Sequence, residues 1–255
     1  MKAVVGIEYL DRFADVRAAG KIDSGGQDLS CPYYIAEWFG PALAEGGHTV
    51  KFLRNNHSVA ERHMRDVAEG GDDAQHADSV DLYFTITHGF YDNREVQLLY
   101  DNQVDDFFGH SKKWHFGDSC NLEWLMIYGC HSIDSNDLPA HVGVFRRLHL
   151  FCGAYGDMFD SWTVDEAGSD LANNLLNGKT VADSWGDGVS DWWVSNHPMV
   201  ISVERVDTWG GGDPHWPDTV IGCDHLWGEG AVLSDVKPSE QFWMAAKWWD
   251  GGLYG

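Results

Sequence analysis

Two stretches of the sequence end in residues that could carry out acyl-transfer chemistry. Residues 122–128 are almost entirely apolar, and the run stops at Gly-Cys-His-Ser, which places a thiol at Cys130. Residues 80–87 have the same form and stop at His88 and Gly89. A thiolate is a strong nucleophile, and imidazole exchanges protons near neutral pH. The two stretches therefore predict a thiol nucleophile with a proton-transfer partner.

Both runs have the pattern of strands that are buried on both faces of a sheet. In an open α/β sheet, functional residues collect in the loops at the carboxyl ends of the strands. If the two strands are neighbours, their ends lie about 5 Å apart, and His88 and Cys130 can face one gap. The backbone amides of Gly89 and Cys130 could then hold a developing oxyanion, where losing one donor costs roughly 3 kcal/mol.

Each of these residues has an ordinary structural interpretation when it is taken alone. A Cys at the end of a buried strand is usually a small core residue, and a lone His at a strand end is usually capped or solvated. Because Cys130 and His88 share the same strand-and-stop context, their combination favours the functional interpretation.

The elements that would position these residues follow an alternating pattern. Strands are predicted over residues 3–9, 49–53 and 80–87, with a helix from Pro32 to the glycines at 46–47 and a polar helix over residues 58–69. Asp28 or Ser30 could cap the first of these helices. The alternation predicts a mostly parallel α/β sheet flanked by helices, with right-handed crossovers.

Later elements are predicted from the same signals. Residues 90–118 form a connection with a short hairpin or helix, and residues 218–223 an extended piece. Further helices and strands are expected over residues 138–147, 148–154, 165–176, 181–194 and 199–206. No composition shift divides the chain, so residues 1–255 are expected to form one domain, with a core over about 1–200 and a Trp/Gly-rich elaboration over about 200–255.

The composition limits the possible partners. The sequence has 17 Lys+Arg against 40 Asp+Glu, a formal net charge of −23, which argues against nucleic acid and against an anionic membrane as partner. Nine of the thirteen Trp residues lie in the last third of the chain. We expect them mainly to pack this segment onto the core, with an aromatic ligand cleft as the alternative.

The cysteines and the N-terminus indicate the compartment. The five cysteines are an odd number without a CxxC pair, which does not form a disulfide framework. The N-terminal apolar run is short, and no window reaches a transmembrane length. The sequence is therefore interpreted as a soluble cytoplasmic protein without a cofactor.

The two strand-end motifs resemble those of the caspase-like cysteine peptidases, which include caspases, metacaspases, legumains and gingipains. The resemblance covers the element order of roughly residues 1–155, and residues 130–132 look like the Cys-His-Ser of metacaspases. It implies a caspase-like sheet and a peptide or protein substrate. Metacaspases carry an Asp two residues before the Cys, where this chain has Tyr128, so a preference for Lys or Arg does not carry over.

In the family, the loop after the next strand lines the first specificity pocket. Here this loop is residues 153–160, so the resemblance implies substrate-binding roles for Tyr155, Asp157 and Asp160. Either acid could instead cap a helix or be solvated. The sequence is also similar to a bacterial and fungal group with a C-terminal Asp-His-Leu-Trp-Gly motif, here residues 224–228, and that similarity implies no activity.

The leading hypothesis is a cysteine-dependent peptidase, or a peptide acyl transferase or cyclase. Cys130 would attack the carbonyl, and His88 would protonate the leaving group. One alternative is a metal-dependent hydrolase that uses His and Asp ligands, and another is a caspase-like pseudoenzyme that acts as a binding module. His215, Cys223 and His225 could bind zinc with a nearby acid, but their spacing fits no standard site, and a packed aromatic–His loop is favoured.

Overall fold

The computed structural model describes residues 1–22, 27–92, 94–102, 105–117, 121–161, 164, 166–190, 196–205, 219–236 and 242–249. Within these residues the chain forms a seven-stranded sheet in the order β10-β9-β8-β7-β3-β1-β2. Strands β2, β1, β3, β7 and β8 run parallel, whereas β9 and β10 are antiparallel to their neighbours. The predicted mostly parallel α/β sheet is therefore confirmed. The strands are β1 Val4–Tyr9, β2 Thr49–Asn55, β3 Leu82–Ile86, β7 Trp124–Tyr128, β8 Leu150–Ala154, β9 Pro198–Arg205 and β10 Phe242–Trp248.

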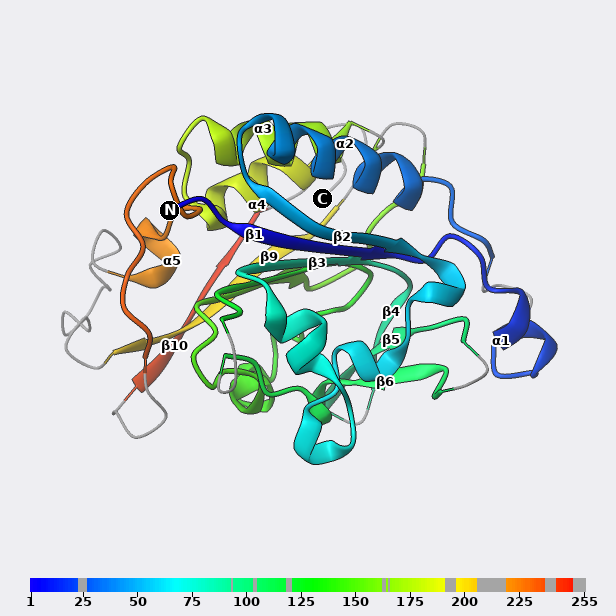
Figure 1. Cartoon of the computed structure of the whole chain (residues 1–255). Helices are drawn as coiled ribbons and strands as arrows, with labels where there is room; N and C mark the ends of the chain where they lie inside the picture. The colour runs from blue at the N-terminus through cyan, green and yellow to red at the C-terminus, as the bar shows by residue number, and fades with distance from the viewer. Residues whose placement is uncertain are drawn as a thin grey trace.

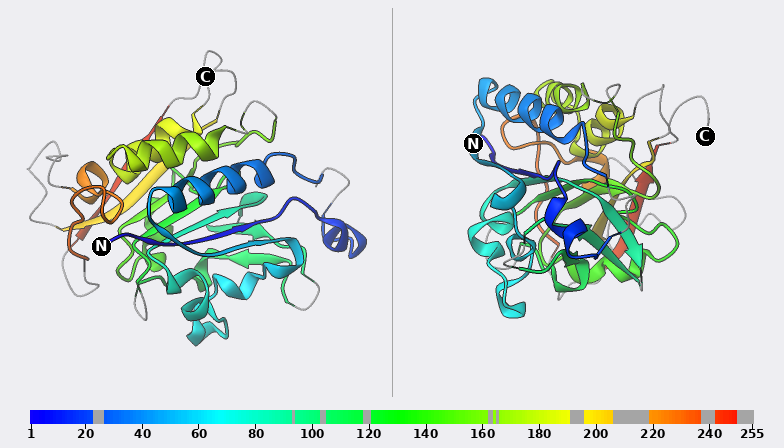
Figure 2. Two further views of the ribbon diagram at one scale, coloured as in Figure 1. Left: turned by 45° about the horizontal axis from the view of Figure 1, so that its top comes forward. Right: turned by 90° about the vertical axis from the view of Figure 1, so that its right-hand side faces the viewer.

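Helices cover one face of this sheet, and shorter elements cover the other (Figures 1 and 2). The helical layer consists of α2 Pro32–Glu45, α3 Ala167–Leu176 and α4 Val181–Val189. A small antiparallel sheet lies against the opposite face together with several 3-10 turns, and it consists of β4 Gly89–Asp92, β5 Glu95–Leu99 and β6 Phe108–His110. Two short helices, α1 Ala14–Ala18 and α5 Val220–Cys223, complete the described fold. The sheet thus separates two hydrophobic cores.

The central strands form because their residues are apolar on both sides. All five residues of β3 and all five of β7 are buried. The helices pack closely on one another above them. A side chain on Gly168 of α3 would lie 2.1 Å from the carbonyl oxygen of Ile35 in α2, so only glycine allows these two backbones to meet.

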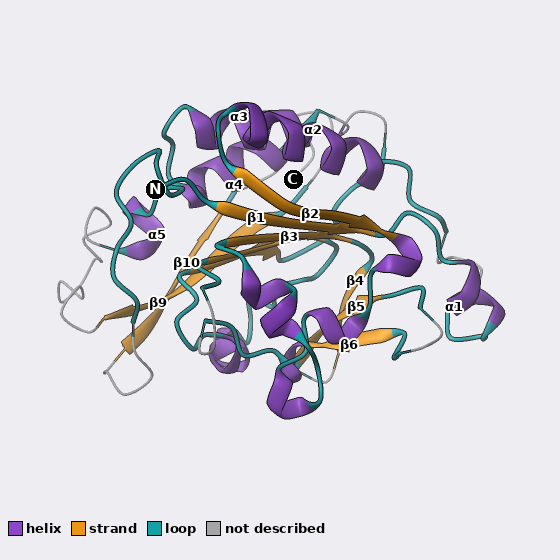
Figure 3. Cartoon of the chain, viewed as in Figure 1, coloured by secondary structure: helices purple, strands orange, loops and turns teal. Residues whose placement is uncertain are grey.

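Three predicted elements are wrong in type. Residues 58–69 do not form an α-helix, because this stretch contains 3-10 turns at Asn56–Ser58, Glu61–His63 and Val67–Glu69 (Figure 3). The helix expected over residues 138–147 is a 3-10 segment, Leu138–Val144, and the extended piece expected over residues 218–223 contains the helical turn α5. The hairpin expected within residues 90–118 is present as part of β4, β5 and β6.

The C-terminal segment joins the main sheet. The boundary expected near residue 200 falls inside β9, and β10 pairs with β9 along its whole length. Trp185 is fully buried and donates from its indole N–H to the carbonyl oxygen of Gly153 at 2.9 Å. Trp192, Trp193, Trp209 and Trp216 lie outside the described residues. No helix among the residues described is long and apolar enough to cross a membrane.

A buried ion cluster ties the segment after α5 to the amino ends of the sheet strands. His149, which precedes β8 and is 2% exposed, places Nδ1 2.8 Å from Asp224 and Nε2 3.0 Å from Glu123. Asp235 adds a third carboxylate at 3.6 Å from Nε2. Burial alone would lower the pKa of His149, but the bonds to Asp224 and Asp235 and the charge of Glu123 outweigh it and raise the pKa to about 10.

The His149 cluster predicts a loss of stability in mildly alkaline solution. A free His titrates near 6.5, so the contribution of His149 is complete below about pH 6.5 and is lost as the pH rises toward 10. We expect the free energy of unfolding in urea to fall across this window by up to about 1.4 kcal/mol per pH unit from this group. His149→Gln should flatten that slope, and an unchanged slope in the variant would contradict the assignment.

Candidate functional site

The carboxyl ends of β3 and β7 carry the two residues proposed to do chemistry. These strands are direct parallel neighbours, with Ile86 opposite Tyr128. His88 and Cys130 follow two residues after this pair, and both line one pocket. Other residues that line it are Cys31, Tyr128, Met158 and Asp160. The sheet order changes direction at β1, so the pocket lies near a switch point, where open α/β sheets bind their ligands.

Two glycines allow the strand ends to meet. A side chain on Gly89 would lie 2.3 Å from the carbonyl oxygen of Cys130, and one on Gly129 would lie 2.8 Å from the carbonyl oxygen of Thr87. Such contacts are far shorter than packing tolerates. The backbone at Gly89 therefore packs directly against the backbone of Gly129 and Cys130.

His88 is held from the outer side of the pocket. Its Nε2 lies 2.9 Å from the carbonyl oxygen of Gln27, and its ring packs on Phe13 with 4.8 Å between ring centroids. Because a carbonyl oxygen only accepts, Nε2 carries a proton, and Nδ1 is the nitrogen available for proton exchange. Among the described residues no hydrogen bond joins His88 to Cys130.

The Cys130 sulfur is partly buried beside the loop that follows β8. The amide of Met158 donates to Sγ at 3.3 Å, and Sγ lies 3.5 Å from the carbonyl oxygen of the same residue. Burial raises the pKa of the Cys130 thiol, and the Met158 amide opposes this only in part. The free thiol is consequently protonated at neutral pH and must lose its proton when it attacks.

The three residues implied in substrate binding have different surroundings. Asp160 lines the pocket and accepts from the amides of Ser30 and Cys31 at 2.7 Å, directly before the first residue of α2. The prediction that Asp28 or Ser30 would cap this helix is wrong, because its N-cap residue is Cys31 and no side-chain capping bond is formed. The carboxylate that binds the Cys31 amide comes from a residue 129 positions away.

The other two residues lie away from the lining of this pocket. The side chain of Asp157 is 73% exposed and pairs with His131 at 3.1 Å. The hydroxyl of Tyr155 lies 3.2 Å from Nδ1 of His197. Of the three, Asp160 is the residue that contacts the space beside Cys130.

Tyr128 holds the loop that follows β8 in place. Its hydroxyl donates to the carbonyl oxygen of Phe159 at 2.9 Å, and the fully buried Asn196 accepts from the Phe159 amide at 2.8 Å. Sequence reasoning missed Asn196, Gln27 and Cys31 as site residues. No local pattern marks them, because each reaches the pocket region from a distant part of the chain.

The described members of the zinc site considered near the C-terminus have other contacts. Cys223 donates to the carbonyl oxygen of Thr219 at 3.1 Å, and a side chain on Gly230 would lie 2.3 Å from the His225 ring. His215 lies outside the described residues. The packed loop favoured from the sequence agrees with these contacts of Cys223 and His225.

The fold and the pocket define an α/β protein that presents a thiol and an imidazole at the carboxyl edge of neighbouring parallel strands. The model of the family DUF6345, described as a domain of unknown function, matches residues 17–248. The chain therefore belongs to this family. No curated protein matches the chain.

Proposed function

We propose that the protein is a cysteine-dependent acyl-transfer enzyme acting on peptide bonds, a peptidase or a peptide acyl transferase of the caspase-like type. The observation that supports this most is the single pocket lined by both Cys130 and His88 at the ends of neighbouring strands. The mostly parallel sheet agrees with the fold that the sequence resemblance implies.

In the proposed reaction, the Cys130 sulfur attacks the carbonyl carbon while its proton passes to His88. The amides of Gly89 and Cys130 stabilise the oxyanion. The C–N bond then breaks, and His88 gives the proton to the leaving amine. Water, or an amine in a transferase, next attacks the thioester and returns a proton to the sulfur through His88.

A His whose main role is to protonate the leaving amine does not need a hydrogen bond to the thiol before the substrate binds. The Gln27 carbonyl oxygen holds Nε2 of His88, which leaves Nδ1 for the proton transfers. Asp160 is the acid placed to contact the substrate side chain, although the amides of Ser30 and Cys31 already neutralise part of its charge. We therefore propose a weak or absent preference for cationic side chains.

Labelling with an electrophilic peptide probe tests the proposed reaction. We expect wild-type protein to be modified at one site, Cys130→Ala to lose the label, and His88→Ala to react about 10²–10⁴ times more slowly, the range of general acid–base catalysis. The matched control is Cys223→Ala, which removes a partly exposed thiol that does not line the pocket and should label normally. Unchanged labelling of Cys130→Ala would refute the mechanism.

A second candidate is a caspase-like pseudoenzyme that binds a partner without catalysis. The raised pKa of the Cys130 thiol and its contact with the carbonyl oxygen of Met158 favour this alternative. The same probe separates the two functions. A pseudoenzyme would show only the reactivity of an ordinary buried thiol, and His88→Ala would not change it.

A further inference from the structure

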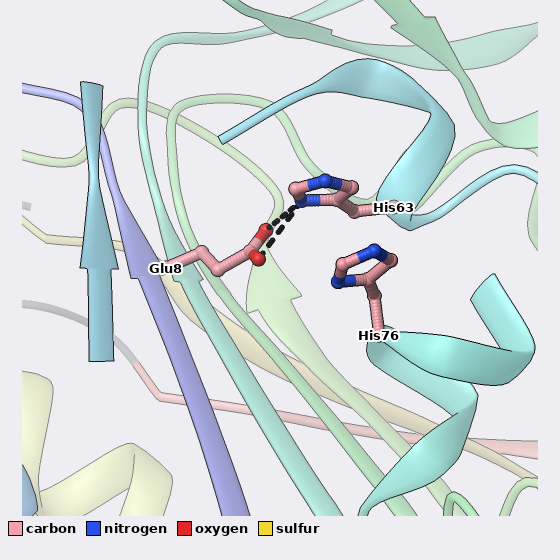
Figure 4. A group of neighbouring side chains, drawn as sticks. All are labelled: Glu8, His63 and His76. Carbon is pink, nitrogen blue, oxygen red and sulfur yellow. Dashed lines mark hydrogen bonds and ion pairs between the residues drawn. The ribbon is translucent and has the colours of Figure 1, made fainter. Parts of the chain in front are cut away.

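A carboxylate and two imidazoles meet on the face of the sheet opposite the Cys130 pocket. Glu8 lies on β1 between Ile7 and Tyr9, which face the helices, so its fully buried side chain faces the other core. His63 and His76 come from the 3-10 region between β2 and β3. Figure 4 shows the Glu8 carboxylate directed at both rings. Any two of the three ligand atoms lie within 4.8 Å of each other.

The spacing of these groups is close to that of metal ligands. Nδ1 of His63 lies 2.9 Å and 3.1 Å from the two oxygens of Glu8, and the His63 and His76 rings stack at 3.7 Å with 17° between their planes. Two nitrogens bound at about 2.1 Å to a tetrahedral zinc ion lie about 3.4 Å apart. Because an imidazole binds a metal ion in the plane of its ring, the two stacked rings must turn relative to each other, as well as draw together, to reach that geometry.

The surroundings of Glu8 and His76 suit metal ligands. The Tyr83 hydroxyl donates to Oε2 of Glu8 at 2.6 Å, and bound carboxylates usually have such an orienting partner. Nδ1 of His76 is in contact with the Arg54 guanidinium, which can only donate, so this nitrogen accepts and carries no proton. Metal ions require the neutral form of histidine.

Arg54 interacts with the same groups. Its guanidinium lies 3.2 Å from Oε1 of Glu8 and also contacts Nδ1 of His76. Arg54 lies on the edge strand β2, and its side chain is 31% exposed, so it can turn toward solvent. A metal ion that binds Glu8 and His76 must replace this guanidinium.

We propose that Glu8, His63 and His76 bind a divalent transition metal of the Zn²⁺ type, and that Arg54 competes with the metal for the Glu8 carboxylate. Two imidazoles with one carboxylate suit Zn²⁺, Co²⁺ or Ni²⁺, whereas Mg²⁺ and Ca²⁺ prefer oxygen ligands alone. Three protein ligands leave a coordination position open. Because the site lies on the other face of the sheet, it does not depend on the function proposed for Cys130.

Cobalt titration of the full chain after chelator treatment tests the proposal. We expect one equivalent of Co²⁺ to give the visible absorbance of a tetrahedral site and Zn²⁺ to displace it. His63→Gln and His76→Gln should each weaken binding by about 100-fold or more, since loss of an orienting partner alone costs 10–100-fold. Arg54→Gln should bind Co²⁺ more tightly than wild type.

The matched control is His57→Gln. His57 lies in a separate group with Asp15 and Asp101 that offers only one imidazole, so this variant should bind Co²⁺ as wild type does. Circular dichroism of each variant identifies any loss of folding. The proposal is overturned if folded wild-type protein gives no stoichiometric cobalt spectrum, or if the folded His63 and His76 variants bind like wild type. An unchanged affinity in Arg54→Gln would overturn the competition.

Discussion

Asp224→Asn is expected to lower the free energy of unfolding by about 3–5 kcal/mol, the usual loss when one partner of a buried ion pair is removed. The Asp224 side chain is fully buried and accepts three hydrogen bonds, each at 2.8 Å. The donors are the indole N–H of Trp124, Nδ1 of His149 and the amide of Leu233. Asparagine has only one carbonyl oxygen, and its NH₂ group would face one of these three donors. The positive charge of His149 would also lose its main negatively charged partner.

Urea unfolding at pH 7 measures this loss, and Asp235→Asn is the matched control. Asp235 lies 3.6 Å from Nε2 of the same His149, but its side chain is 38% exposed. Solvent screens such a pair, so its replacement should cost about 1 kcal/mol or less. If the two variants lose equal stability, the buried cluster does not hold the C-terminal segment in place.

The sheet could be predicted because its signal is local. β3 and β7 are buried on both faces, and the apolar runs that result are visible in the sequence whatever else surrounds them. One run stops at His88 and the other at Cys130. The carboxyl ends of neighbouring parallel strands lie at the same edge of a sheet, so these two residues were expected to lie close together. The pocket that they share is therefore the part of the site that sequence alone could indicate.

The elements that were predicted wrongly depend on contacts between distant residues. In residues 58–69, Glu61 and His63 are buried and pair with Arg65 and Glu8, and Asp66 accepts from the Ala68 amide. These side-chain contacts replace α-helical packing, and nothing in the local periodicity signals them. The predicted cap of α2 is wrong for the same reason. Asp160, which accepts from the amide of the N-cap residue Cys31, comes from the loop after β8.

The site beyond His88 and Cys130 was only partly predictable. Asn196 hydrogen-bonds Phe159 and Tyr128, and Gln27 hydrogen-bonds His88, from parts of the chain with no recognisable motif. Tyr128 was noticed as a departure from the metacaspase pattern. Its role, fixing the loop through Phe159, follows only from the structure.

Gly89→Ala tests whether the close contact between the strand ends is needed for the proposed chemistry. The added methyl group would lie 2.3 Å from the carbonyl oxygen of Cys130 and 3.2 Å from the carbonyl carbon of Gly129. Both neighbours are backbone atoms, so the ends of β3 and β7 must separate. We expect a loss of about 1–3 kcal/mol in stability, as for other overpacked sites, and loss of probe labelling at Cys130.

Gly143→Ala is the matched control for this substitution. A side chain at Gly143 would meet nothing within 4 Å, so stability and labelling should both stay at wild-type values. The decisive case is a Gly89→Ala protein that remains folded by circular dichroism but no longer reacts with the probe. That result would show that the close approach of the Gly89 backbone to Cys130 is needed for the reactivity of the thiol. A folded variant that labels at the wild-type rate would remove the oxyanion role from Gly89, because its amide would then have moved without effect.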